Sequence, residues 1–180
     1  MFQKCMEKRV CLNPYKCFFG AFKGVLLGHM VSKDGIEMTQ DQIKAIQEAV
    51  APTNAGEISS FIGYVNFYRR FVAKLAKLAN PMYALTKKEV VFTWDTKCQE
   101  GFESIKENIS RKPILRQPKW NVIFHVHVDT SGVALGAILA QLEGEVDFPI
   151  YFVSRRFSQA EQVDTTTERE ALCMVFVLKC

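Results

Sequence analysis

Residues 121–141 read NVIFHVHVDTSGVALGAILAQ, and this stretch decides the expected fold. Apolar side chains alternate with others along it, which predicts one strand over residues 121–128 and a second over residues 132–141. A third strand is expected over residues 147–153, after a short acidic turn. Three strands linked by hairpins are the beginning of a mixed α/β domain.

Two acids stand out beside these strands. Asp129 follows the first strand, and a carboxylate at such a place costs free energy to bury unless it is paired or holds a cation. Glu170 lies in the first turn of a later helix, for which Thr167 is the expected N-cap. Two carboxylates from a strand and a helix are part of what a two-metal phosphodiester hydrolase needs. Taken alone, an acid at a strand end and an acid at a helix start are more often a turn residue and a helix cap.

Upstream of this unit, capping residues and apolar spacing predict several helices. Pro113 and Pro118 mark residues 111–120 as a linker. Gly63 lies within one apolar stripe, where it lowers helix propensity and indicates a close packing contact. The expected helices are residues 40–49 with Thr39 as N-cap, a second after Thr53 or Asn54 with a stripe reaching Phe71, residues 75–85 broken at Pro81, and residues 96–110 with Asp95 as N-cap.

The first segment of the chain contains short apolar runs broken by glycines. Together with the turn at residues 33–35, these runs predict two short strands in a hairpin. Residues 2–9 are expected to form the last turns of a helix.

The net charge of +4 hides a basic middle. Residues 58–88 contain six lysines and arginines and no acid. A basic helical stretch beside carboxylates suits a nucleic-acid enzyme, although charge alone is equally typical of a solvated face. The sequence contains neither a secretory signal nor an apolar run of the roughly 20 residues that a membrane helix needs, so we expect an intracellular protein without a membrane partner.

Motifs along the whole chain add a family resemblance. Four segments resemble, in order, the ribonuclease H domain of gypsy-type long-terminal-repeat retrotransposons: residues 128–131, 135–141, 150–158 and 166–172. Upstream segments resemble the reverse transcriptase of the same Pol polyproteins: residues 12–20 and 27–36 its palm-to-thumb region, residues 61–71 its thumb helix, and residues 92–94 and 98–102 its connection.

The resemblance implies an α/β (α+β) fold in three parts. Residues 1–38 would be the end of the reverse transcriptase palm with a primer-grip-like hairpin. Residues 39–120 would be the helical thumb and connection. Residues 121–180 would be the N-terminal half of a ribonuclease H-like domain, lacking the strands that cover its first strand.

The resemblance also implies roles for single residues. Asp129 would be the first metal-binding carboxylate of the ribonuclease H site and Glu170 the second, with Glu168 as the rival for that place. The metal would be Mg²⁺ or Mn²⁺.

The nucleic-acid contacts implied by the resemblance lie upstream. Gly28 and His29 match the hairpin that grips the primer end. Arg69 and Arg70 would contact the backbone of a template–primer duplex, and their alternative is a solvated helix face.

The implied parent activities are RNA-directed DNA synthesis and metal-dependent cleavage of the RNA strand of RNA–DNA hybrids. The partners would be such a hybrid or a template–primer duplex, and the rest of the Pol polyprotein. The printed sequence holds no Tyr-x-Asp-Asp polymerase turn and only two of the four ribonuclease H acids, so we expect this chain alone to be an inactive fragment. The alternative is a non-catalytic nucleic-acid-binding or interaction module from a decayed element.

Overall fold

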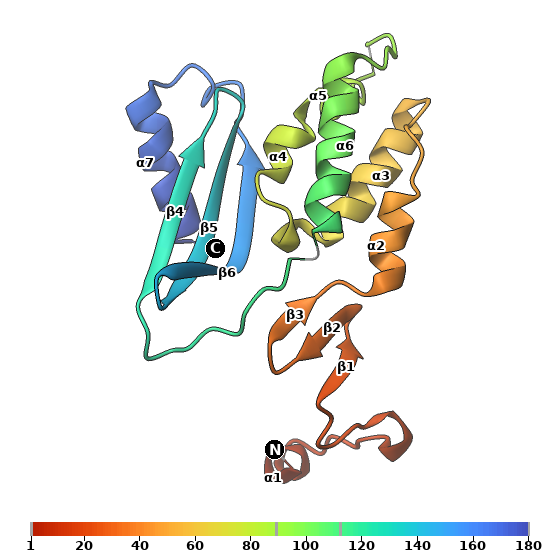
Figure 1. Ribbon diagram of the computed structural model, residues 1–180, viewed down its shortest axis with the longest axis vertical. Helices are drawn as coiled ribbons and strands as arrows, with labels where there is room; N and C mark the ends of the chain where they lie inside the picture. Colours follow the sequence, from red (N-terminus) through yellow and green to blue (C-terminus); the bar gives the residue numbers. More distant parts are fainter. Residues whose placement is uncertain (1, 89, 112, 180) are drawn as a thin grey trace.

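The computed structural model describes residues 2–88, 90–111 and 113–179, and these residues form two antiparallel three-stranded sheets with helices between and beside them (Figure 1). The mixed α/β class expected from the sequence is confirmed. One sheet lies near the N-terminus, and the other carries Asp129.

The N-terminal sheet has three strands instead of the two predicted. The turn at residues 33–35 is correct, but Gly35 itself starts a third strand that pairs with Ser32 and its neighbours. This strand escaped prediction because it is three residues long and begins at the turn glycine. The elements of this part are α1 (Phe2–Glu7), a 3-10 turn η1 (Pro14–Lys16), β1 (Lys23–Leu26), β2 (His29–Ser32) and β3 (Gly35–Glu37).

The helical unit follows the predictions from capping residues closely. The Thr39 capping box, the Asn54 cap and the Asp95 cap are all formed. The first of these helices ends at Gln47, before the predicted residue 49, and Val50 beyond it is exposed. No helix in the described residues is long and apolar enough to cross a bilayer. The unit comprises α2 (Gln40–Gln47), α3 (Ala55–Phe67), the 3-10 turn η2 (Arg69–Phe71), α4 (Leu75–Leu78), α5 (Asn80–Ala84) and α6 (Thr96–Ser110).

The close packing expected at Gly63 occurs at a different helical glycine. A Cβ at Gly63 would meet nothing within 4 Å, so that prediction is wrong. A Cβ at Gly101 in α6 would lie 2.3 Å from the carbonyl oxygen of Leu78. The missing side chain at Gly101 therefore lets α6 approach the end of α4.

The second sheet runs in the order β4-β5-β6, with β4 at an edge. Its strands are β4 (Phe124–Thr130), β5 (Ala134–Glu143) and β6 (Val146–Arg156), followed by α7 (Thr166–Val177). β4 starts and ends later than predicted, so Asp129 lies inside the strand opposite Gly136. The predicted Thr167 cap is also wrong, since Thr165 caps α7 and forms a capping box with Glu168.

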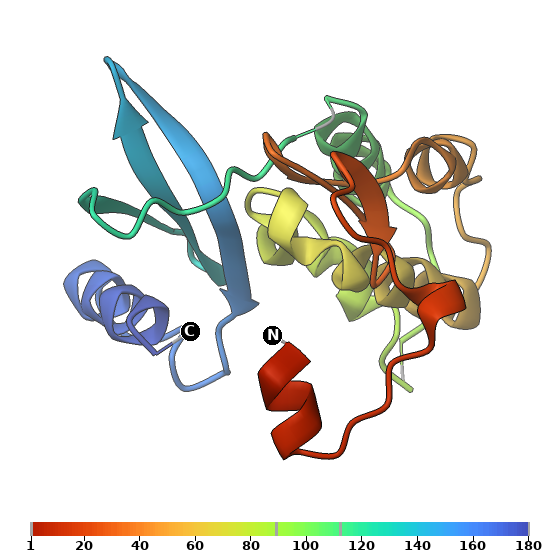
Figure 2. The same ribbon diagram turned by 90° about the horizontal axis from the view of Figure 1, so that it is seen from below.

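This sheet lies between two helical layers (Figures 1 and 2). On one face, Leu135 and Ala137 pack with Cys173 of α7 in a small buried cluster. On the other face, Phe152 packs against the core of the helical unit, and the Ala76 amide donates a hydrogen bond to Ser154 Oγ at 3.0 Å. Side chains at successive positions of β4 therefore face different helices.

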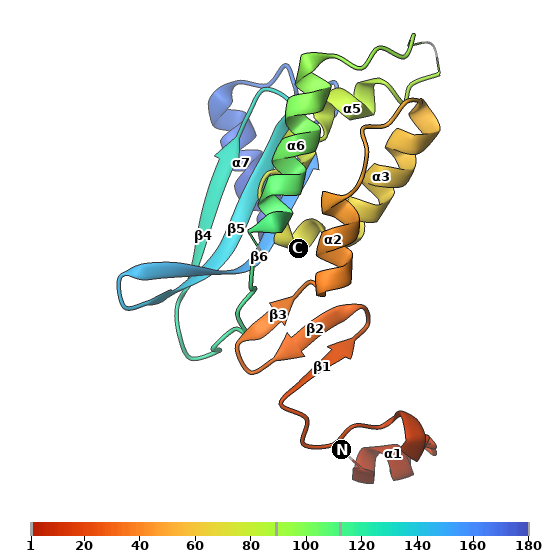
Figure 3. The same cartoon turned by 45° about the vertical axis from the view of Figure 1, so that its right-hand side comes forward.

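The predicted linker makes backbone hydrogen bonds with one strand of each sheet. Leu115 is buried and exchanges two backbone hydrogen bonds with Ile36 of β3, at 2.8 and 2.9 Å. The next residue, Arg116, donates its amide to the carbonyl of Pro149 in β6. Gly35 makes this approach possible, because a Cβ there would lie 2.1 Å from the Leu115 carbonyl oxygen. Figure 3 shows the linker passing from the helices to β4 near β3.

Candidate active site

Asp129 presents its carboxylate at the surface instead of burying it. Its side chain is 53% exposed, and Oδ2 lies 3.0 Å from the Nζ of Lys74. Lys74 precedes α4 in the left-handed conformation (φ 56°), which turns the chain toward the sheet. Asp129 pairs with Gly136, and a Cβ at Gly136 would lie 3.8 Å from the Lys74 Cγ, so the lysine side chain occupies the space that this glycine leaves beside the carboxylate. Such an exposed ion pair stabilises the fold by at most about 1 kcal/mol.

The two glutamates of α7 lie in different surroundings. The Glu168 carboxylate accepts hydrogen bonds from the Thr165 amide and from Thr165 Oγ1, both at 2.8 Å. These bonds hold the pKa of Glu168 below its ordinary value. Glu170 is exposed, and its carboxylate has no hydrogen-bond or ion-pair partner within the described residues. Of these two glutamates, only Glu170 therefore has a carboxylate that does not already accept hydrogen bonds from the fold.

The first turns of α7 lie at the end of the sheet that carries Asp129. Arg169 Nη1 donates a hydrogen bond to the carbonyl of Ser131 at 3.4 Å. One turn further, the buried Cys173 thiol donates to the carbonyl of Gly136, the residue opposite Asp129. Glu170 and Cys173 share a helix face because they are three residues apart.

The hairpin that carries Gly28 and His29 packs on the helical unit and is hydrogen-bonded to it. Leu27 and Gly28 both have positive φ (49° and 79°), as the type I′ hairpin turn requires. Gln42 Nε2 donates to the Gly28 carbonyl at 2.7 Å. The His29 ring is buried and stacks on Phe67, with centroids 5.4 Å apart. Desolvation and the nearby Arg70 lower the pKa of His29, so the imidazole is neutral at pH 7.

The two arginines that follow α3, Arg69 and Arg70, lie in different surroundings. Arg70 is half-buried, and its guanidinium carbon lies 5.7 Å from the centre of the Tyr151 ring in β6. Arg69 is exposed and lines a hollow together with Arg155, Arg156 and Tyr83. The structure therefore brings Arg69 to the C-terminal end of β6 and uses Arg70 between the helical unit and the sheet.

Comparisons with known proteins match this arrangement. Residues 94–180 match the RNase H-like domain found in reverse transcriptase. The Pol polyprotein from transposon 297 of Drosophila melanogaster is 35% identical over 180 residues, covering 99% of this chain and 17% of that protein. That from transposon 412 of the same species is 32% identical, covering 94% and 14%. The chain belongs to the retrotransposon Pol polyprotein family.

Further relatives support this assignment, which the gypsy-type resemblance predicted. The transposon Tf2-3 polyprotein of Schizosaccharomyces pombe is 28% identical and covers 98% of this chain and 13% of that protein. The chain thus spans less than one fifth of the length of each of these Pol polyproteins.

Solved structures show the same fold at lower identity. The foamy viral protease–reverse transcriptase in complex with an RNA/DNA hybrid superposes with a TM-score of 0.72 at 21% identity, covering 87% of this chain and 21% of that one. The same protein in complex with double-stranded DNA gives 0.71 at 22% identity, covering 88% and 33%.

The Pol family implies a divalent metal, and the residues present suit one. Asp129 and Glu170 offer the hard oxygen donors that Mg²⁺ prefers, and both carboxylates are accessible to solvent. The Lys74 ammonium already places positive charge beside Oδ2 of Asp129. A metal bound to that oxygen would take the place of Lys74.

Three basic residues of this site were missed by the sequence analysis. Arg155 and Arg156 lie within a motif used for the family resemblance, yet no role was given to them. The Arg156 guanidinium lies 4.7 Å from the Tyr83 ring centre, and Arg155 is paired with Glu161. Lys74 was counted only in the basic stretch. The signal for Arg155 and Arg156 was their adjacency at the end of a predicted strand, but their contact with the helical unit depends on tertiary packing.

Proposed function

We propose that this segment of Pol holds a nucleic-acid duplex against the ribonuclease H-like sheet and supplies two metal-binding carboxylates for cleavage of the RNA strand. The RNase H-like match and the fold shared with a reverse transcriptase solved on an RNA/DNA hybrid support this proposal. The single observation that carries it is the exposed Asp129 carboxylate with a cationic group 3.0 Å away. We assign residues 1–38 to the palm end, 39–120 to thumb and connection, and 121–180 to the ribonuclease H-like domain.

In this proposal Asp129 and Glu170 are the carboxylates that bind Mg²⁺ or Mn²⁺. Glu168 is the weaker candidate, because the α7 cap already uses both its charge and its oxygens. When bound, the metal would activate a water molecule and stabilise the leaving oxygen of the phosphodiester. Lys74 keeps the Asp129 carboxylate neutralised and oriented until the metal arrives.

The duplex contacts are assigned to the exposed Arg69 and the half-buried Arg156. Arg69 and Arg156 line one hollow and would bind phosphates of the RNA–DNA hybrid or template–primer duplex. Arg70 stacks on Tyr151 and would position β6 beside the helical unit. His29 is buried, so we propose that it and Gly28 hold the hairpin whose exposed tip, Leu27, faces the primer end.

Further parts of Pol are the proposed protein partner. Three aromatic side chains before β1, Tyr15, Phe18 and Phe22, are 94%, 87% and 91% exposed. Large apolar side chains exposed to this degree are typical of a surface that another domain covers.

The proposed carboxylate pair is tested by Mn²⁺ binding, followed by electron paramagnetic resonance. Glu170→Gln and Asp129→Asn should each weaken Mn²⁺ binding, on the order of tenfold or more for the loss of a charged ligand. Glu168→Gln is the matched control, because glutamine at the same position of the cap keeps the capping box and loses only the charge. Weakened binding in Glu168→Gln with normal binding in Glu170→Gln would reverse the assignment.

The activity is tested with a labelled RNA–DNA hybrid in Mg²⁺ or Mn²⁺. Cleavage that is lost in Asp129→Asn supports a working ribonuclease H site. Salt-sensitive binding without cleavage supports the second candidate function, a nucleic-acid-binding module. That candidate is favoured by one observation: three arginines, Arg69, Arg155 and Arg156, line one hollow and could contact phosphates.

A further inference from the structure

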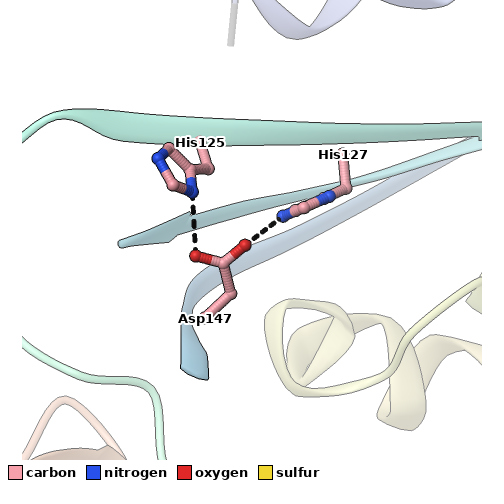
Figure 4. A group of neighbouring side chains, drawn as sticks. All are labelled: His125, His127 and Asp147. Atoms are coloured by element: carbon pink, nitrogen blue, oxygen red, sulfur yellow. Dashed lines mark hydrogen bonds and ion pairs between the residues drawn. The ribbon is translucent and has the colours of Figure 1, made fainter. Parts of the chain in front are cut away.

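Two histidines and an aspartate meet on one face of the second sheet, away from Glu170. His125 Nδ1 lies 2.9 Å from Asp147 Oδ1, and His127 Nε2 lies 2.7 Å from Asp147 Oδ2 (Figure 4). One ligand atom from each residue lies within 4.8 Å of the other two. The three residues therefore already direct two nitrogens and one carboxylate toward a common point.

The sheet fixes these positions. His125 and His127 are two residues apart in β4 and so point to the same face. Asp147 comes from the start of β6 and reaches them across β5, where the intervening residue opposite His125 is the small, buried Ala140. A register shift at Leu139 and Ala140 bends β6 at this place. Ligands held on paired strands are better ordered than ligands on loops.

We propose that His125, His127 and Asp147 bind a transition-metal ion, with Zn²⁺ as the preferred occupant. Two imidazoles and one carboxylate are a common three-residue ligand set for zinc, with bonds of about 2.0 to 2.2 Å. Neutral imidazole is a poor ligand for Mg²⁺ and a good one for Zn²⁺ and its neighbours in the first transition row. This donor set therefore separates the site from the oxygen ligands Asp129 and Glu170.

Both imidazoles can adopt the tautomer that metal binding requires. In the metal-free site each bonded imidazole nitrogen donates to Asp147. For metal binding each neutral ring carries its proton on the other nitrogen, Nε2 of His125 and Nδ1 of His127. The side chains of His125 and His127 are 37% and 55% exposed, so solvent reaches the rings and a water molecule can complete four-coordination.

The bound ion would link β4 to β6 across the sheet. β4 lies at the edge of the sheet, and its outer side has no strand partner within the described residues. A metal bound by β4 and β6 would restrain that edge strand and so the position of Asp129, two residues after His127. An ion that binds only the folded chain also raises its melting temperature.

The experiment is a titration of the metal-free chain with Zn²⁺, followed by calorimetry and by thermal unfolding. We expect one equivalent at this site and a rise in melting temperature. His127→Ala and Asp147→Asn should each remove that equivalent and the rise, by loss of affinity of about 100-fold or more. Glu145→Gln is the matched control, because Glu145 is an exposed acid two residues from Asp147.

Two further variants locate the ion independently of the proposed ribonuclease H site. The double variant Asp129→Asn, Glu170→Gln should keep the zinc equivalent even if it loses Mn²⁺. A zinc equivalent that disappears there and persists in His127→Ala overturns the inference. Zinc that is displaced only when thiols such as the exposed Cys11 are alkylated also overturns it. Asp147→Asn can keep both imidazole contacts as hydrogen bonds, so this variant should still fold. Loss of zinc binding in Asp147→Asn would then report loss of a ligand and not loss of the fold.

Discussion

Lys74 Nζ lies 3.0 Å from Asp129 Oδ2, an ion pair that joins the helical unit to the carboxylate of the ribonuclease H-like sheet. The two residues come from different parts of the chain, and the left-handed conformation of Lys74 brings them together. The contact places a protein cation where the proposed function needs a metal cation. It therefore couples metal binding at Asp129 to the packing of α4 on the sheet.

The first prediction follows from this competition. Lys74→Met keeps the length of the side chain and removes its charge, so Mn²⁺ affinity should rise by up to about fivefold, the worth of an exposed ion pair. Lys77→Met changes an exposed lysine of α4 and should leave affinity unchanged. Mn²⁺ titration by electron paramagnetic resonance measures both. Weaker binding in Lys74→Met would mean that Lys74 orients Asp129 more than it competes with the metal.

The second prediction separates the two arginines after α3. Arg69→Gln should weaken binding of an RNA–DNA hybrid and reduce the slope of log affinity against log salt by about 1, the loss of one phosphate contact. Arg70→Gln should leave that slope unchanged and lower the melting temperature, since Arg70 stacks on Tyr151. Fluorescence anisotropy at several salt concentrations gives the slopes. Equal slopes for Arg69→Gln and the unchanged chain would remove Arg69 from the interface.

The third prediction compares two helical glycines. Gly63→Ala should increase the free energy of unfolding by about 1 kcal/mol, because alanine favours the helix and its Cβ meets open space. Gly101→Ala should decrease it by about 1 to 3 kcal/mol, because the new Cβ would collide with the Leu78 carbonyl and force α6 away. Urea unfolding followed by circular dichroism measures both changes. The same sign for both variants would contradict the packing of α6 against α4.

These glycines also show how far the sequence predicts the fold. Local signals held well: α6 begins after Asp95 and ends at Ser110 as predicted, because an N-cap and an apolar stripe act within a few residues. Gly63 and Gly101 look alike in sequence, and only tertiary packing distinguishes them. The bounds of β4 were also missed, since alternation at Val122 and Phe124 does not say where pairing with β5 begins.

The surroundings of the proposed site could be predicted only in part, for the same reason. The motifs pointed to Asp129 and Glu170, and the structure brings both segments to one end of the sheet. Lys74 and Arg156 join the site through the packing of the helical unit on β5 and β6, which no local pattern encodes. The meeting of His125 with Asp147 likewise depends on the β6 register and its shift near Ala140. Sequence patterns thus indicate single residues of the proposed site but not the neighbours that surround them.

The fourth prediction concerns the Arg155–Glu161 pair, which fixes the loop between β6 and α7. Arg155 donates to both Glu161 oxygens at 2.9 Å, and the Ser158 amide adds a third bond at 2.7 Å. These bonds lower the pKa of Glu161 from 4.5 to about 2. Because the folded-state pKa lies below the unfolded one, the stabilisation is complete above about pH 4.5 and is lost as the pH falls toward 2.

Glu161→Gln should therefore lower the free energy of unfolding by about 1 kcal/mol at pH 7, a value that allows for the partial exposure of the pair. The difference from the unchanged chain should shrink between pH 4.5 and pH 2, because Glu161 itself becomes neutral there. Urea unfolding at a series of pH values measures this difference, with Glu145→Gln as the exposed control. A difference that is constant from pH 7 to pH 3 would show that Glu161 acts through packing and not through its charge.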